Sequence, residues 1–145
     1  MNKAMKTGLL TAALSLAAPL TAFAQESSSP LLGTVSGNVA IVSDYVFRGI
    51  SQTSNNAAIQ GGLDWDSGAG LYLGTWASSL NFGDANAATT EVDLYGGYAG
   101  AIDNFSYDLG VIFYWYPGAR GALNYNLWEV YGKSGYDFGV ADISA

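Results

Sequence analysis

The sequence contains no cysteine and no histidine, and only five of its 145 residues are lysine or arginine. Without cysteine there is no disulfide framework and no thiolate metal site. Without histidine the chain lacks the commonest general base and metal ligand. The twelve acidic residues give a net charge of −7, and nucleic-acid binding by counterion release needs clustered basic residues instead. We therefore expect no enzyme, no metal site, no cofactor and no nucleic-acid partner.

The first 24 residues are typical of a secretory signal peptide. Lys3 and Lys6 supply a positive start, an apolar run follows over residues 9–20, and small residues directly precede a cleavage point at Gln25. A transmembrane helix is the alternative, but the run is shorter than the ~20 apolar residues that a membrane helix needs. The exported part keeps three basic residues and all twelve acidic ones, a net charge of −9 (3 − 12).

Hydrophobic residues make up 50% of the chain and charged residues only 12%, and the apolar residues of the exported part are spread in alternation. A period of two predicts β-strands with one apolar and one polar face. In residues 71–79 the pattern does not decide which face is which. We expect strands over residues 36–49, 57–64, 71–79, 91–98, 105–116 and 127–132, and a seventh strand that starts near Tyr136.

The first predicted strand contains the stretch Ser43-Asp44-Tyr45-Val46-Phe47-Arg48-Gly49. Its alternation predicts one continuous strand, with Asp44 and Arg48 on the same face. Four residues of strand span about 13 Å, so these two side chains are too far apart to pair directly. If the following turn centres on residues 53 and 54, Gln60 lies opposite Arg48.

Longer and shorter connections alternate along the predicted strands. Residues 52–56, 81–90 and 117–126 form the longer connections, whereas residues 66–70, 100–104 and 133–135 form short turns. Outer-membrane barrels have short periplasmic turns and longer outer loops. The pattern predicts an all-β fold, an antiparallel up-and-down transmembrane β-barrel of about seven strands over residues 25–145. Because bacterial single-chain barrels have an even number of at least eight strands, we expect the chain to be the N-terminal part of a longer barrel.

Charged residues recur on one face of these strands. A wet lumen explains them, because a charge that faces lipid at the bilayer midplane costs ~2–4 kcal/mol for Arg or Lys and less for acids. The solvated face of an ordinary antiparallel sheet is the alternative. The same carboxylates could in principle serve a hydrolase, but their recurrence along successive strands favours a lining. The candidate lumen-lining residues are Asp44, Arg48, Gln60, Asp64, Glu91, Asp93, Asp108 and Glu129.

Aromatic residues gather near the ends of the predicted strands. Membrane barrels carry girdles of aromatic residues at both lipid–water boundaries, where amphipathic rings are favoured. The core of a soluble barrel is the alternative. The candidate girdle residues are Trp65, Trp76, Tyr114, Trp115, Tyr116 and Trp128.

Several segments resemble the TorF family, a proteobacterial outer-membrane family assigned as porins largely by inference. The resemblance is carried by residues 43–53, 58–62 (AIQGG), 70–78 (GLYLGTWAS), 91–98 (EVDLYGGY) and 110–118 (GVIFYWYPG), in this order. It covers nearly all of the exported chain. It implies a barrel in the outer membrane of a Gram-negative cell, and it brings no substrate or binding residues with it. Members are longer and such barrels usually end on an aromatic residue, which this chain lacks.

We expect a porin-like barrel that lets small polar solutes or ions diffuse passively across the outer membrane, with a lumen that mildly favours cations. Its partners are then outer-membrane lipid and the solutes, and the sequence leaves open whether it forms a homo-oligomer. Two alternatives remain. One is a non-conducting structural barrel, because small lumens filled by side chains do not conduct. The other is a soluble periplasmic barrel that binds an apolar ligand, as lipocalins do.

Overall fold

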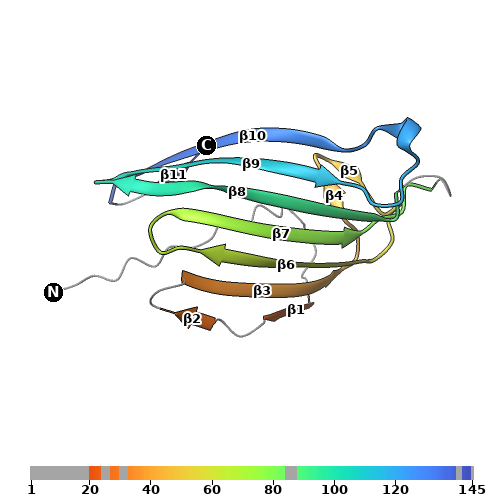
Figure 1. The fold of residues 1–145 in the computed structure, drawn as a ribbon, viewed down its shortest axis with the longest axis horizontal. Coiled ribbons are helices and arrows are strands. Elements are labelled where there is room, and N and C mark those ends of the chain that lie inside the picture. Colours follow the sequence, from red (N-terminus) through yellow and green to blue (C-terminus); the bar gives the residue numbers. More distant parts are fainter. Residues whose placement is uncertain (1–19, 24–26, 30–32, 84–87, 140–141, 145) are drawn as a thin grey trace.

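The computed structural model describes residues 20–23, 27–29, 33–83, 88–139 and 142–144. Six long strands form one antiparallel sheet and follow one another in sequence order (Figure 1). They are β3 (Gly33–Val42), β6 (Ala58–Asp66), β7 (Leu71–Ser79), β8 (Thr90–Ile102), β9 (Phe105–Trp115) and β10 (Leu127–Asp137). Three short strands flank them: β1 (Leu20–Phe23) and β2 (Ser27–Ser29) pair with β3, and β11 (Asp142–Ser144) pairs with β10.

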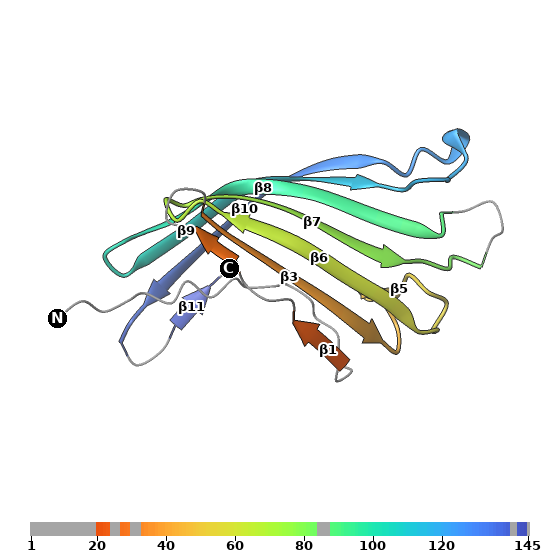
Figure 2. The ribbon, with the colours of Figure 1, turned by 60° about the horizontal axis from the view of Figure 1, so that its bottom comes forward.

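The sheet is open within the part of the chain that the structure describes. Its order is β1-β3-β6-β7-β8-β9-β10-β11, so β1 and β11 lie at opposite ends and do not pair with each other. Figure 2 shows the sheet bent into an arch. The predicted all-β antiparallel fold is confirmed; the described strands form an open sheet and not a closed barrel, so the incomplete barrel that the sequence predicts stays a prediction. β1 falls within the predicted signal peptide, and residues 1–19 and 24 of that segment lie outside the described residues.

The prediction of a single strand over residues 36–49 is wrong. β3 ends at Val42, and the chain then forms a separate small hairpin of β4 (Val46–Phe47) and β5 (Ile50–Ser51). Arg48 and Gly49 have positive φ angles of 48° and 83°, which a two-residue hairpin turn requires. The alternation of Tyr45 and Phe47 with polar residues resembles a strand, but the turn residues on either side end the pairing with the main sheet. Residues 43–57 are therefore the connection between β3 and β6, and we call them the 43–57 connection.

The first five connections alternate in length as predicted, whereas the sixth is placed wrongly. Three connections are long, over residues 43–57, 80–89 and 116–126, and the last of them contains the short 3-10 helix Gly121–Leu123. Two connections are short turns, over residues 67–70 and 103–104. Residues 133–135, predicted as the sixth turn, instead lie inside β10 and pair with residues 106–108 of β9. The long connections share one end of the sheet, which we call the loop end, and the short ones share the other, the turn end.

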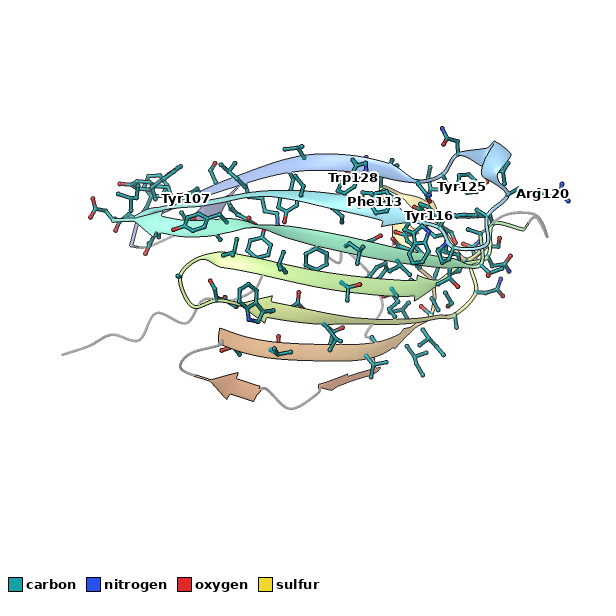
Figure 3. The ribbon with its side chains drawn as sticks, viewed as in Figure 1. Tyr107, Phe113, Tyr116, Arg120, Tyr125 and Trp128 are labelled. Carbon is teal, nitrogen blue, oxygen red and sulfur yellow. The ribbon has the colours of Figure 1, made fainter. Side chains whose placement is uncertain are left out.

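The three long connections contact one another at the loop end. The Asn81 amide donates to the carbonyl of Gln52 at 2.9 Å. Tyr125 packs edge-on against both Phe82 and Tyr116, with 5.7 Å between ring centroids in each pair. Figure 3 shows Tyr116 and Tyr125 together at this end, while Arg120 points away from the fold. The loop end is thus a packed region and not a set of independent loops.

Little hydrophobic side-chain area is buried. The buried hydrophobic residues of the described chain are Val42, Ala58, Leu80 and Ala88, all at or beside the loop end. Many larger apolar side chains are exposed on the sheet instead, among them Leu109 at 63% and Val130 at 80%. Within the described residues, no helix has the length and hydropathy to span a membrane. The exposed apolar side chains of this sheet differ from those of a two-sheet sandwich, whose inner faces are buried.

Candidate functional site

The two faces of the sheet differ completely in charge. Residues paired across neighbouring strands share a face, and neighbours along a strand point to opposite faces. By this register, every charged residue of the six long strands lies on one face, which we call the polar face; the opposite face is the apolar face. The charged members of the polar face are Asp64, Asp66, Glu91, Asp93, Asp108, Glu129, Lys133 and Asp137.

The apolar face carries aliphatic and aromatic side chains on every long strand. Ile41 pairs with Ile59, Tyr98 pairs with Leu109, and Val111 pairs with Val130. Phe113 stacks on Trp128 with 4.5 Å between ring centroids, and Figure 3 shows the two side by side over β9 and β10. Large exposed apolar surfaces are typical of faces that interact with a membrane or another protein.

Tyrosine hydroxyls hold the carboxylates in the middle of the polar face. The Tyr95 hydroxyl donates to Asp64 Oδ1 at 2.5 Å, and the Tyr72 hydroxyl donates to Asp108 Oδ1 at 2.5 Å. Tyr131 is hydrogen-bonded to Tyr72, and Lys133 Nζ lies 3.5 Å from Asp108 Oδ2. Each carboxylate therefore has a partner from a neighbouring or next-nearest strand, which fixes its position on the face.

A second group lies toward the loop end of the polar face. The Tyr114 hydroxyl donates to Glu129 Oε2 at 3.2 Å, and Arg48 donates to Glu129 Oε1 at 2.6 Å. Glu91 and Asp93 of β8 are only 2% and 6% exposed. The Tyr45 hydroxyl donates to Glu91 at 3.1 Å, whereas Asp93 Oδ1 is buried without a hydrogen-bond partner. Two neighbouring carboxylates thus lie beneath the 43–57 connection.

Asp44 organises the base of the 43–57 connection. Its Oδ1 accepts hydrogen bonds from the hydroxyls of Ser51 at 2.6 Å and Thr53 at 2.7 Å. These two bonds lower the pKa of Asp44 below its ordinary value. Thr53 is 2% exposed, and its Oγ1 also accepts a hydrogen bond from the Tyr45 amide at 3.2 Å and lies 2.6 Å from the Asn56 carbonyl oxygen. The connection is therefore a structured element held by its own side chains.

Most of the predicted lumen-lining residues lie on the polar face, but two do not lie where the sequence places them. Gln60 donates to Ser78 there at 3.3 Å, and the five acidic candidates of β6, β8, β9 and β10 lie on the same face. Asp44 and Arg48 lie in the 43–57 connection and not in a strand, so the prediction that they share a strand face is wrong. Gln60 pairs with Ala40, and Arg48 contacts Glu129 on β10 instead.

Five of the six predicted girdle residues divide between the two faces, and the sixth lies outside the strands. Trp65, Trp115 and Trp128 lie on the apolar face. Trp76 pairs with Asp93, and Tyr114 bonds Glu129, so these two belong to the polar face and cannot form a lipid-facing girdle. Tyr116 lies just beyond β9 and packs against Tyr125. Closeness to a strand end suggested a girdle, but the alternation within the strand decides which face an aromatic ring occupies.

The predicted lumen-lining residues do not include the tyrosines of the polar face or Lys133, although the alternation in residues 91–98 places Tyr95 on the face of Glu91 and Asp93. Tyr72, Tyr95 and Tyr131 each alternate with apolar residues, so the parity of their positions was a usable signal. Lys133 was assigned to a turn because Ser134-Gly135 follows it. Within the described residues there is no group of three or more side chains that could hold a metal ion. The polar face thus carries mostly acidic side chains, several of them held by hydrogen bonds.

Comparison with known proteins gives a family and no function. No curated protein matches the chain, and no solved structure does. The family model described as a bacterial protein of unknown function, Gcw_chp, matches residues 24–145. That match does not carry the TorF name, so the resemblance to TorF stays a prediction. Because this match covers the whole segment after the predicted signal peptide, the chain belongs to the bacterial family Gcw_chp.

Proposed function

We propose that this chain forms the wall of an outer-membrane β-barrel through which small polar solutes or ions diffuse passively. The observation that supports this most strongly is the separation of the two faces. All charged residues of the six long strands lie on one face, and the other face carries exposed side chains such as Ile59, Leu109 and Val130. A membrane barrel needs this division, because its strands alternate lipid-facing and lumen-facing residues.

The apolar face needs a hydrocarbon environment. Full burial of one Val, Leu, Ile or Phe side chain contributes about 1.5–3 kcal/mol. Val35, Leu73 and Leu94 lie on three different strands and are all exposed. Leu109 on β9 and Val130 on β10 are exposed as well. In water, these side chains would not gain the free energy of burial. Contact with lipid chains would provide that free energy along the whole apolar face.

The strand lengths suit a bilayer. A tilted transmembrane β-strand needs ~9–11 residues, and the six long strands have 9 to 13. Unpaired backbone groups are not tolerated in hydrocarbon. The proposal therefore requires the exposed edge of β10, over Leu127–Ser134, to pair in the membrane with further strands or with another copy of the chain.

A non-conducting barrel is the second candidate, and one observation favours it. The 43–57 connection packs over the polar face, where Phe47 meets Tyr114 and Arg48 meets Glu129. Such an insertion narrows a lumen and could close it. The lipocalin-like alternative has less support, because it needs an apolar interior, and here the covered face carries Glu91 and Asp93.

Two measurements test the proposal. Membrane fractionation should recover the protein in the outer membrane; recovery in the soluble periplasm would favour the lipocalin-like alternative. The purified protein, reconstituted in a planar bilayer, should produce single-channel steps with a modest preference for cations. Reconstituted protein that is folded and inserted but silent at all voltages would contradict passive diffusion and favour the structural barrel.

A further inference from the structure

The 43–57 connection reaches across the polar face at the loop end. Tyr45 packs edge-on against Trp76 of β7 with 5.4 Å between ring centroids, and its hydroxyl bonds Glu91 of β8. Phe47 packs against Tyr114 of β9 at 6.2 Å. Arg48, at the tip of the hairpin, forms its 2.6 Å ion pair with Glu129 of β10. The connection thus contacts four successive strands, and it does so on their polar side. Figure 2 shows β5 at the loop end, near the ends of β6 and β7.

The base of the connection is fixed independently of these contacts. The Gln52 amide donates to the Tyr45 carbonyl at 2.6 Å, which closes the hairpin. The Asp44 hydrogen bonds to Ser51 and Thr53 hold the same two segments together. Ser54 donates to the Asn81 carbonyl at 2.8 Å and so ties the base to the next long connection. A segment with this many internal bonds and wall contacts has a defined position over the polar face.

The charges around the hairpin are mainly acidic. Glu91, Asp93 and Glu129 lie on the sheet beneath it, and Arg48 supplies a guanidinium on the hairpin itself. Carboxylate rings favour cations in a pore, whereas arginine or lysine favours anions. The balance at this level therefore favours cations, and Arg48 moderates that preference.

We infer that the 43–57 connection is the constriction of the proposed lumen, where it limits the size of the solutes that pass and sets the preference for cations. This inference rests on the proposed barrel and adds the element that controls passage through it. The side chains of Tyr45, Phe47 and Arg48 reduce the open cross-section at the loop end. The acidic groups beneath them form the charged wall of the narrowed part.

The most direct test removes the hairpin tip. Replacing residues 46–51 with Asn-Gly leaves a two-residue turn between Tyr45 and Gln52, which already hydrogen-bond to each other. Single-channel conductance should rise by about twofold or more, because the narrowest cross-section limits conduction. Liposome-swelling assays should show entry of larger neutral sugars. The matched control replaces residues 118–123 of another long connection with Asn-Gly and should leave both readouts unchanged.

Arginine substitutions separate charge from size. Arg48→Gln removes the guanidinium beside Glu129 and should raise the cation-to-anion permeability ratio by about twofold or more, since it leaves the carboxylates unopposed. Arg120→Gln removes the same charge from a side chain that points away from the fold, so the ratio should stay unchanged (Figure 3). Equal effects of the two substitutions would contradict a local role for Arg48.

A cross-link tests the position of the hairpin without any conduction. The chain has no native cysteine, so Phe47→Cys with Tyr114→Cys provides the two thiols of the protein. A short bifunctional thiol reagent should join them rapidly in membranes, and Phe138→Cys with Tyr114→Cys should not cross-link.

Absence of the first cross-link, or unchanged conductance after removal of residues 46–51, would contradict the constriction but not the proposed barrel. Silence of the intact protein would instead contradict passive diffusion. Conduction by the shortened protein alone would then show that the 43–57 connection closes the lumen, as in the non-conducting barrel.

Discussion

The two faces of the sheet are formed by the same strands but differ in how their side chains are exposed and hydrogen-bonded. On the apolar face, side chains such as Leu73, Leu109 and Val130 stand exposed with few polar neighbours. On the polar face, carboxylates such as Asp64 and Asp108 are held by tyrosine hydroxyls. In the proposed barrel, lipid stabilises the apolar face, whereas hydrogen bonds between side chains stabilise the polar face. A substitution should therefore have different consequences on each face, even at adjacent residues.

The largest expected effect comes from a charge on the apolar face. Val111→Arg should lower the free energy of unfolding in lipid by about 2–4 kcal/mol, because arginine near the bilayer midplane is costly. Ile112→Arg, one residue along β9 and on the polar face, is the matched control and should cost clearly less. Denaturant unfolding from lipid vesicles measures both. Equal effects of the two variants, or a more soluble and equally stable Val111→Arg protein, would contradict the assignment of the faces.

A methyl group at Gly97 should disturb the polar face. A Cβ there would collide with the Tyr72 hydroxyl and with the Leu109 carbonyl. Gly97→Ala should therefore destabilise the protein by about 1–3 kcal/mol, as overpacking does. Gly132→Ala is the control, since a Cβ there approaches only the end of the Leu109 side chain, at 3.3 Å. Thermal or denaturant unfolding compares them, and equal stability of both variants would mean that Tyr72 does not rest on Gly97.

Loss of a single hydroxyl should have a smaller effect, and only on the polar face. Tyr72→Phe removes the donor to Asp108 and the partner of Tyr131, so we expect a loss of about 0.5–1.5 kcal/mol. Tyr98→Phe, on the apolar face, should change stability by less, because its ring stacks on Tyr107 and the stack is retained. A Tyr98→Phe variant as destabilised as Tyr72→Phe would argue against the hydroxyl network as the source of stability.

The smallest expected effect is a pH dependence at the base of the 43–57 connection. The hydrogen bonds from Ser51 and Thr53 lower the pKa of Asp44 in the folded chain. The stability contributed by the Asp44 carboxylate is thus present above the ordinary aspartate pKa of about 4 and is lost as pH falls through the lowered value. Backbone hydrogen exchange of residues 44–53 should quicken in that acidic range relative to β9. Asp44→Asn should abolish the extra pH dependence, and an unchanged profile would show that Asp44 is not its source.

Alternation along single strands predicted most of the fold. The range 71–79 coincides with β7, and the range 105–116 extends β9 by one residue. The same alternation assigned Asp64, Glu91 and Asp108 to one face, because a strand with a period of two leaves no other choice. The tyrosine partners on that face follow from the same parity, although their hydrogen bonds depend on the register between strands.

The 43–57 connection could not be predicted from local pattern. Tyr45 and Glu91 are 46 residues apart, and Arg48 and Glu129 are 81 residues apart, so these contacts depend on how the sheet bends. The strand-like alternation of Tyr45 and Phe47 hid the break after Val42. The Arg48-Gly49 pair was a usable signal, because glycine accepts the positive φ that a tight hairpin turn requires.

The orientation of the two faces in the membrane can be measured directly by a cysteine scan of β9. Single cysteines at residues 109–114 of this cysteine-free chain, labelled with an environment-sensitive fluorophore, report contact with brominated lipid or with an aqueous quencher. We expect lipid quenching at positions 109, 111 and 113 and aqueous quenching at 110, 112 and 114, with a period of two. Aqueous quenching at 109, 111 and 113, or uniform quenching along the strand, would contradict the account.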